Sequence, residues 1–323
     1  MLISRFLDPK NNYAFFKIFG TEKNKDILIH FLNDILGYTG DEEIKEVTFL
    51  KTNQDPDIAV YRQSIVDVLC KDKHGTQFIV EMQVSKHPGF EKRAQLYAAK
   101  AYSKQILKED ENHKKMAVYA KLKGVIFLAI ADFVLFPKKE SWRSNHRMLD
   151  TKTYENDLED FYFIFMELSK FNKELDQLEN LQEKWAYFFK HAHESTLEEM
   201  EHLIGNDLVI KKAFYALDQA SWSEEELNTY EKMVKTEMDN LAVEEQKIMD
   251  AEAKGQARGE AKGIEKGMAK GMEKGTAIGI EKGIEKGEAK QKVIMAKKML
   301  AKNKPLDEIV DFTGLTEEEI EKL

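Results

Sequence analysis

The first apolar residues of the chain recur at helical spacing. In residues 11–19 and 24–36, apolar side chains return every three or four positions, which predicts two amphipathic helices. Gly37 and Gly40 follow the second segment, and glycine is typical of the position after a helix. The second helix is therefore expected to end at Gly37.

From residue 46 the pattern changes to one typical of β-strands. Three segments are rich in β-branched and aromatic residues, namely 46–52, 58–71 and 76–85. Residues 72–75, DKHG, separate the last two and predict a hairpin turn. A hairpin symmetric about His74 would place residue 67 opposite residue 81.

A helix and two strongly apolar segments follow the hairpin. Residues 90–110 have helical spacing, whereas 124–136 and 161–168 are almost continuously apolar, as is typical of buried strands. The order of helix, three strands, helix and strand predicts an α/β fold, in which helices flank a mixed sheet.

The C-terminal half is expected to be helical. Residues 172–247 are acidic with helical spacing, and Trp185, Phe188 and Phe189 are expected to pack these helices onto the core. In the tail, residues 291–303 predict an amphipathic helix. Pro305 predicts the start of another helix and Gly314 its end, and Thr316 with Glu319 predicts a capping box.

Between these parts, glycine occupies every fourth position from Gly255 to Gly287. Nine glycines inside a helix would cost about 7–9 kcal/mol relative to alanine. If helical, the segment would span roughly 50 Å. It lacks the Gly-Lys-Ser/Thr of a phosphate loop, and its many charges exclude a membrane helix pair. A spacer and a close-packing oligomer stripe both remain open.

We therefore expect four regions. They are a core at 1–171, an acidic helical extension at 172–250, a glycine-repeat spacer at 251–290 and a small helical tail at 291–323. The chain carries no apolar segment near the roughly 20 residues of a membrane helix and no secretory signal at its start. The lack of such a segment predicts no membrane partner. One cysteine, Cys70, cannot form an internal disulfide, which favours a cytoplasmic location.

Charge is distributed unevenly along the 323 residues. Residues 1–150 hold 24 Lys and Arg against 20 Asp and Glu, whereas 151–250 hold 10 against 24. A polyanionic partner is therefore expected to bind the first part. Charge balance of this kind also tunes solubility, so it does not by itself establish nucleic-acid binding.

The hairpin brings together the candidate chemistry. Alternation places Glu81 and Gln83 on the face opposite to Phe78, Val80 and Met82, and so away from the buried side. Asp67, opposite Glu81, would have its Cβ roughly 4.5–5.5 Å from that of Glu81. Two carboxylates this close repel unless a proton or cation lies between them, and such oxygen ligands suit Mg²⁺. The same spacing also occurs on ordinary solvated strands.

The helix after the hairpin carries a basic stripe. Its members lie three or four residues apart, and they are Arg93, Tyr97, Lys100, Lys104 and Lys108. Cations beside paired carboxylates suit a phosphodiester, because they hold the backbone whose phosphate a metal-activated water would attack. The stripe predicts a DNA-binding surface, although many basic stripes are merely solvated faces.

Ordered segments of the chain resemble the recombination-promoting nuclease and transposase family of the PD-(D/E)XK superfamily. The matching segments are 7–20, 64–83, the helix from Arg93 to Tyr102, 119–136, 165–171, 185–189 and 216–231. The resemblance implies a restriction-endonuclease-like core with helical appendages. It also implies that Asp67 and Glu81 are the superfamily's metal-binding acids. Gln83 stands where the superfamily usually has lysine, and Val66 where it has proline.

The sequence thus favours a Mg²⁺- or Mn²⁺-dependent DNA endonuclease that promotes recombination or mobile-element activity. Asp67 and Glu81 would bind the metal, Gln83 would position water, and Arg93, Tyr97, Lys100 and Lys104 would contact DNA. The alternative is a catalytically degenerate nuclease fold acting as a DNA- or protein-binding assembly module. The glycine repeat or the tail would then mediate assembly, including homo-oligomerisation.

Overall fold

The computed structural model of the chain describes residues 5–51, 53–54, 64–107, 119–205 and 207–323. These residues form two compact units, 1–238 and 239–323, and the boundary between them falls inside one long helix. Within the described residues, no helix is long and apolar enough to cross a membrane.

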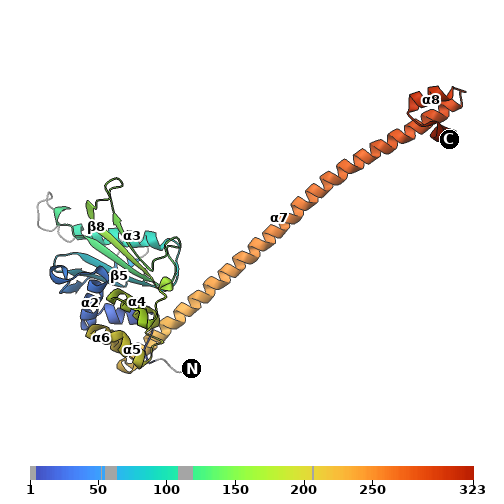
Figure 1. The fold of residues 1–323 in the computed structure, drawn as a ribbon. Helices are drawn as coiled ribbons and strands as arrows, with labels where there is room; N and C mark the ends of the chain where they lie inside the picture. Colours follow the sequence, from blue (N-terminus) through green and yellow to red (C-terminus); the bar gives the residue numbers. More distant parts are fainter. Residues whose placement is uncertain (1–4, 52, 55–63, 108–118, 206) are drawn as a thin grey trace. The chain divides into compact units, whose positions relative to one another are not determined.

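The first unit is built on a mixed six-stranded sheet with the order β1-β4-β5-β6-β8-β7 (Figure 1). Its strands are β1 (Val47–Phe49), β4 (Val68–Asp72), β5 (Gln77–Gln83), β6 (Val125–Ala131), β7 (Arg143–Met148) and β8 (Leu158–Glu167). Strands β5, β6 and β8 run parallel, whereas β1, β4 and β7 pair antiparallel with their neighbours. The expected mixed α/β sheet is confirmed.

Helices cover both faces of this sheet. They are α1 (Asn12–Phe19), α2 (Lys25–Leu36), α3 (Phe90–Leu107), α4 (Leu181–His191), α5 (Leu197–Ile204) and α6 (Leu208–Leu217). Alternation along β5 divides its side chains between two cores. Phe78, Val80 and Met82 join the core that contains α1, α2, α4 and α6, whereas Ile79 joins the core under α3. Helix α3 is the crossover between the parallel strands β5 and β6.

The aromatic side chains of α4 pack onto the first core, as the sequence predicted. Trp185, Phe188 and Phe189 are fully buried, and the Trp185 ring lies 5.1 Å from that of Phe31 in α2. The indole Nε1 of Trp185 donates to Oδ2 of Asp34 at 2.7 Å. Helices α4, α5 and α6 are therefore part of the same packed unit as the sheet.

The strands of the structure differ from the predicted ones in three places. The segment 58–71 is not one strand, because β4 begins only at Val68, and residues 58–63 lie outside the described part. A short second sheet pairs β2 (Asn53–Gln54) with β3 (Ser64–Ile65). The edge strand β7 was not predicted, because its sequence RSNHRM lacks the apolar alternation on which the prediction relied.

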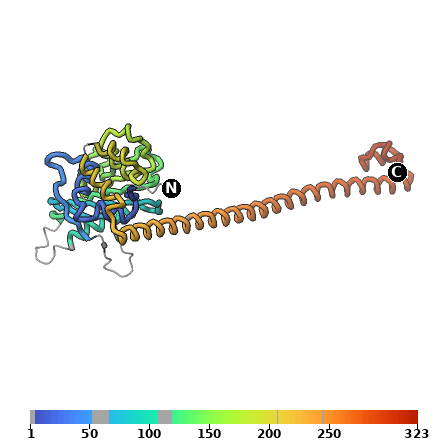
Figure 2. Tube along the Cα trace, turned by 90° about the horizontal axis from the view of Figure 1, so that it is seen from below, coloured from blue at the N-terminus to red at the C-terminus, as the bar shows by residue number. Residues whose placement is uncertain are grey.

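The second unit holds most of α7 (Glu224–Leu300), followed by α8 (Leu306–Thr313) and α9 (Glu317–Glu321). Helix α7 continues without a break through the glycine repeat (Figure 2). Ala296, Ile309 and Ile320 form a small core between the three helices. Gly314 ends α8 with φ of 65°, and Thr316 and Glu319 form the predicted capping box.

Candidate active site

The hairpin of β4 and β5 brings Asp67 beside Glu81. Val68 pairs with Val80 and Lys71 with Gln77, so the register is symmetric about His74 as predicted. Asp67 lies just before β4 and accepts a hydrogen bond from the backbone N–H of Met82 at 2.8 Å, through Oδ2. In return, Oε2 of Glu81 accepts from the backbone N–H of Asp67 at 3.2 Å. These two bonds hold the carboxylates against each other.

The carboxylate pair is buried, which corrects the expectation of a solvent-facing position for Glu81. Alternation was right, since Glu81 shares a face of β5 with Ile79. However, α3 covers that face, and Glu81 is only 5% exposed. Strand alternation separates the two faces of a sheet but does not say which of them a helix covers. Gln83, at the end of the strand, is half-buried.

Burial changes the protonation of both acids. Removal from water, together with the nearby charge of Asp67, raises the pKa of Glu81 to about 8. Burial likewise raises the pKa of Asp67 to about 6. Backbone hydrogen bonds and the Arg93 guanidinium oppose these shifts without cancelling them. Without a cation, burial and mutual repulsion therefore favour protonation of the pair, and of Glu81 first.

The donor chemistry of this pair fits a hard divalent cation. Each backbone hydrogen bond occupies one carboxylate oxygen, Oδ2 of Asp67 and Oε2 of Glu81. The second oxygen of Glu81, Oε1, also lies 3.9 Å from Nη2 of Arg93. Among the described residues, no group of three or more His, Cys, Asp or Glu side chains is placed to hold a metal. Mg²⁺ nevertheless needs only one or two protein carboxylates, because water and substrate phosphate complete its shell.

Arg93 reaches the carboxylates from α3. Its Nη2 donates to Oε1 of Gln83 and lies 3.9 Å from Oε1 of Glu81. The guanidinium carbon lies 5.0 Å from the ring centre of Phe90 and 5.9 Å from that of Tyr97. Arg93 therefore brings positive charge to the place where Gln83 brings none.

The predicted basic stripe is not one open surface. Tyr97 is buried beside the acids, and burial is the main cause that raises the pKa of its hydroxyl. Lys100 and Lys104 lie about one and two turns beyond Tyr97 in α3. Both side chains are half-buried. Lys108 lies outside the described residues. The structure thus gathers Arg93 with the acids and Gln83, and leaves the two lysines farther along the helix.

Lys10 and Asp132 lie next to this site and were not predicted. The Nζ of Lys10 is 2.8 Å from Oδ2 of Asp132, and the backbone N–H of Asp132 donates to the carbonyl of Gln83 at 3.0 Å. Asp132 directly follows β6, and the carboxyl ends of parallel strands commonly carry functional residues. The sequence did not reveal Asp132, because the predicted strand 124–136 continued past it, whereas β6 ends at Ala131. The pairing with Lys10 depends on the fold.

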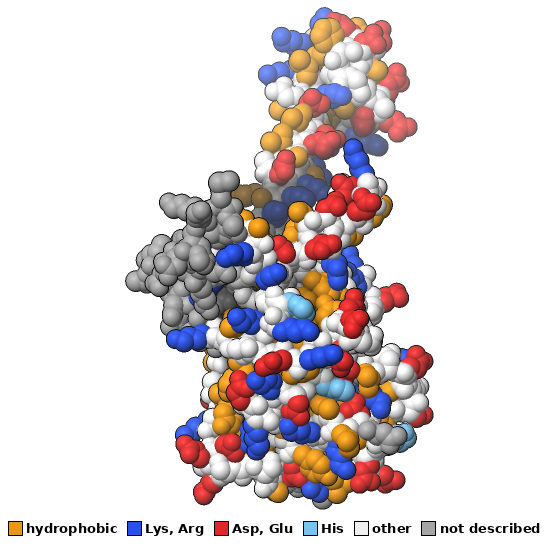
Figure 3. Space-filling view, turned by 90° about the vertical axis from the view of Figure 1, so that its left-hand side faces the viewer, with side chains coloured by type: hydrophobic (Ala, Val, Ile, Leu, Met, Phe, Trp, Pro, Cys, Tyr) orange, Lys and Arg blue, Asp and Glu red, His pale blue; other side chains and the backbone are white. Residues whose placement is uncertain are grey.

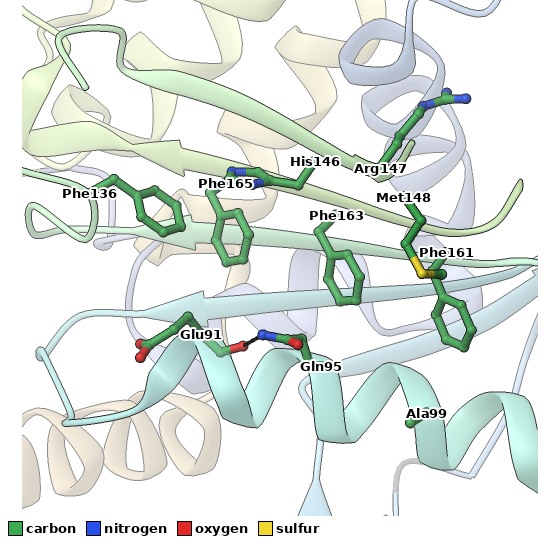
Figure 4. A pocket seen from close by; sticks show the side chains of 10 residues that line it. All are labelled: Glu91, Gln95, Ala99, Phe136, His146, Arg147, Met148, Phe161, Phe163 and Phe165. Carbon is green, nitrogen blue, oxygen red and sulfur yellow. Dashed lines mark hydrogen bonds between the residues drawn. The ribbon is translucent and has the colours of Figure 1, made fainter. Parts of the chain in front are cut away.

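A separate hollow lies on the other side of α3, between this helix and strands β7 and β8 (Figure 4). It encloses about 510 Å³, and much of its wall is aromatic, including Phe136, Phe161, Phe163 and Phe165. Across the sheet, Phe165 aligns with Ala129 and Glu81. The hollow is mostly apolar and contains no acid pair, so phosphodiester chemistry fits the β4–β5 hairpin better.

On the face drawn in Figure 3, basic and acidic side chains are interspersed over the described residues. Close to the acid pair, Arg93 supplies positive charge, since its Nη2 lies 3.9 Å from Oε1 of Glu81.

The fold agrees with that of a known nuclease family. A six-stranded mixed sheet flanked by helices is consistent with a PD-(D/E)XK type of α/β fold. The chain belongs to the PD-(D/E)XK nuclease family transposases, whose sequence model matches residues 9–247. No curated protein and no solved structure matches it. Membership supports a nuclease-type function.

Proposed function

We propose that this protein is a divalent-metal-dependent DNA endonuclease, with Asp67 and Glu81 as the metal ligands. The observation that carries the proposal is the buried acid pair. Its carboxylates accept hydrogen bonds from the backbone N–H groups of Met82 and Asp67. Burying two like charges is costly unless a proton or a cation compensates them. Mg²⁺ or Mn²⁺ is the cation proposed.

The ion would supply Lewis-acid stabilisation of the phosphate's developing charge and a more acidic water. The protein's own side chains position the metal ligands and the amide of Gln83. Backbone hydrogen bonds hold the two acids beside each other on the hairpin, and Arg93 fixes the amide of Gln83 by donating to its Oε1. The Nε2 group of Gln83 then remains as a donor for water or a phosphate oxygen.

For Arg93 we propose a role beside the metal site in addition to the predicted DNA contact. Its contacts with Gln83 and Glu81 support this role. Positive charge there would stabilise the extra negative charge of a phosphoryl transition state. Lys100 and Lys104 remain the proposed backbone contacts, and Tyr97 packs beneath Arg93.

Plasmid nicking by the purified full chain tests this proposal. Asp67→Ala and Glu81→Ala should each reduce Mg²⁺-dependent nicking at least about 100-fold, because each removes a ligand of the ion. Glu91→Ala is the matched control, since Glu91 lies on the side of α3 that lines the aromatic hollow. Circular dichroism must show that all three variants keep the fold.

The rival function is a nuclease fold that binds without cutting. The observation in its favour is Gln83, which lacks the charge of the lysine usual at this position. Wild-type protein that binds DNA but shows no nicking with Mg²⁺ or Mn²⁺ would favour the rival. Nicking that persists unchanged in both acid variants would remove the proposed site.

A further inference from the structure

The hollow between α3 and strands β7 and β8 has the size and the walls of a binding site for a planar ring (Figure 4). Its volume of about 510 Å³ lies in the range of small-molecule pockets. Phe161 and Phe163 of β8 line it with their ring planes 7° apart, and Phe136 lines it at one end. All three side chains are only partly buried. Together they form an aromatic surface on which a flat ring can stack.

One side-chain amide faces this aromatic surface. In Figure 4, Gln95 of α3 lies across the hollow from Phe163. Its Nε2 donates to the backbone carbonyl of Glu91 at 3.1 Å, which fixes the amide and leaves Oε1 as an acceptor. The carboxylate of Glu91 points away from Phe163. The hollow thus offers a neutral hydrogen-bond acceptor beside the rings.

Positive charge borders the same hollow. The Nζ of Lys139 lies 5.2 Å from the ring centre of Phe136 and 3.3 Å from Nε2 of His146. His146 is the cross-strand partner of Phe163. Burial and the ammonium of Lys139 lower the pKa of His146, so its imidazole is neutral at pH 7. Lys139 forms no salt bridge to an acid within the described part of the chain, so its charge is open to an anion beside the rings.

These three features match the three parts of a nucleotide. Aromatic side chains stack bases in many proteins that bind single strands. A glutamine Oε1 accepts a hydrogen bond from the amino group of adenine, cytosine or guanine, whereas thymine has no amino group. Lysine pairs with phosphate. An apolar side chain of a protein partner would use the rings but neither the amide nor the lysine, so a nucleotide fits the hollow better.

The hollow also lies close to the candidate active site. Phe165 aligns across two strand pairings with Ala129 and then Glu81, a distance of roughly 10 Å. The ring of Phe90 lies 6.4 Å from that of Phe165 and 5.0 Å from the guanidinium carbon of Arg93. A DNA strand held at the acids would therefore reach the hollow within about three steps of 3.4 Å.

We propose that this hollow binds one unstacked base of single-stranded DNA and favours bases that carry an amino group. Phe161 and Phe163 stack the base, Oε1 of Gln95 accepts from its amino group, and Lys139 contacts the phosphate. A base enters only from a single strand or an opened duplex, because a paired base is stacked between its neighbours. This inference rests on the proposed function insofar as DNA is the ligand, but it does not require cleavage.

Binding of labelled single strands to the full chain tests the proposal. The probes are an oligodeoxycytidylate and an oligothymidylate of equal length, which differ at the amino group of the base. Fluorescence anisotropy in EDTA measures affinity without metal and therefore without cleavage. Wild type should bind the cytosine strand about three- to ten-fold more tightly, the value of one hydrogen bond. Equal affinity for the two strands would contradict the amino-group preference.

Two substitutions at Phe163 separate stacking from packing. Phe163→Leu should weaken binding of the cytosine strand about ten-fold, because leucine keeps apolar volume but has no flat ring. Phe163→Tyr keeps the ring and should bind within about two-fold of wild type. Circular dichroism shows whether both variants are folded. A folded Phe163→Leu that binds like wild type would overturn the proposal.

Gln95 and Lys139 test the other two contacts. Gln95→Leu should bind the two strands with equal affinity, because the acceptor is lost. Lys139→Gln should weaken both strands by about three-fold or more, whereas Lys138→Gln is the matched control and should change them by less than about two-fold. Equal losses in the two lysine variants would indicate a general effect of charge and overturn the phosphate contact.

Failure of this inference can be distinguished from failure of the proposed endonuclease, because binding in EDTA and nicking in Mg²⁺ are separate measurements. If wild type nicks plasmid but Phe163→Leu binds single strands like wild type, only the base-binding hollow is overturned. If wild type does not nick but its strand binding depends on Phe163 and Gln95, the hollow is supported and the endonuclease is overturned.

Discussion

The first unit and the glycine tract of α7 differ in the contacts that their side chains make. In the first unit, the side chains that define the site come from distant positions, as when Lys10 meets Asp132 or Asp67 meets Met82. In the tract, each residue from 251 to 292 is exposed, and the contacts of its backbone are those of the helix itself. Substitutions should therefore act through tertiary packing in the first region and through local propensity or a second chain in the other.

The largest expected difference concerns Trp185. It is fully buried against Phe31 and Phe188, so Trp185→Ala should lower the free energy of unfolding by about 3–5 kcal/mol. Glu273→Ala, exposed in α7, should change it by less than about 0.5 kcal/mol. Urea unfolding followed by tryptophan fluorescence measures the first unit through Trp142 and Trp222, and far-UV circular dichroism follows the helix that carries Glu273. A loss below about 1 kcal/mol for Trp185→Ala would contradict this packing.

The second largest effect is expected for Arg93, on the rate of nicking. Arg93→Ala should reduce nicking by about 100-fold, since it removes the charge beside Glu81 and the donor that fixes Gln83. Arg93→Lys should recover part of that loss, because it restores charge without the forked geometry. Initial nicking rates at saturating Mg²⁺ give the comparison. Equal nicking rates for wild type and Arg93→Ala would show that Arg93 does not contribute to the reaction.

Gln83 should have a smaller effect. Gln83→Ala is expected to lose about ten-fold in nicking rate, less than removal of either acid, because only orientation of water is lost. Gln83→Lys should stay active but need more Mg²⁺ for its half-maximal rate, since its charge repels the ion. A Mg²⁺ titration of the three proteins separates these effects. If Gln83→Ala follows wild type throughout, Gln83 is only a polar residue at the end of β5.

Stability against pH should reveal the buried acids. The pKa of Glu81, raised to about 8, lies above that of an unfolded glutamate, so the folded metal-free protein binds more protons between about pH 4 and 8. The melting temperature should therefore fall by several degrees as pH rises through this window. Glu81→Gln should remove most of the fall, because the amide does not titrate. Differential scanning fluorimetry in a chelator measures it, and an equal slope in both proteins would oppose the assignment.

The smallest effect should come from deleting the tract. A fragment of residues 1–248 retains the whole first unit and should melt cooperatively within about 3 °C of its transition in the full chain. Scanning calorimetry gives the comparison. An insoluble fragment beside a well-behaved full chain would show that the first unit requires the tract.

Local patterns were sufficient for much of the fold. Helical spacing located α1 and α2, Gly37 ended α2 in the left-handed conformation, and the turn at 72–75 set the hairpin register. They failed where the signal was weak or absent. Polar β7 pairs because β8 offers it an edge, and the break before Val68 depends on Asp67 turning toward Met82.

By itself, the sequence determined the four-residue period of the glycine repeat, the pairing of position 67 with 81 and the face that Glu81 shares with Gln83. These follow from the periods of helix and strand, which need only neighbouring residues. The tertiary structure alone decided that α3 covers the acids, that Arg93 reaches Gln83, and that Lys10 meets Asp132. Burial and long-range contacts depend on how whole elements pack, and no local period encodes them.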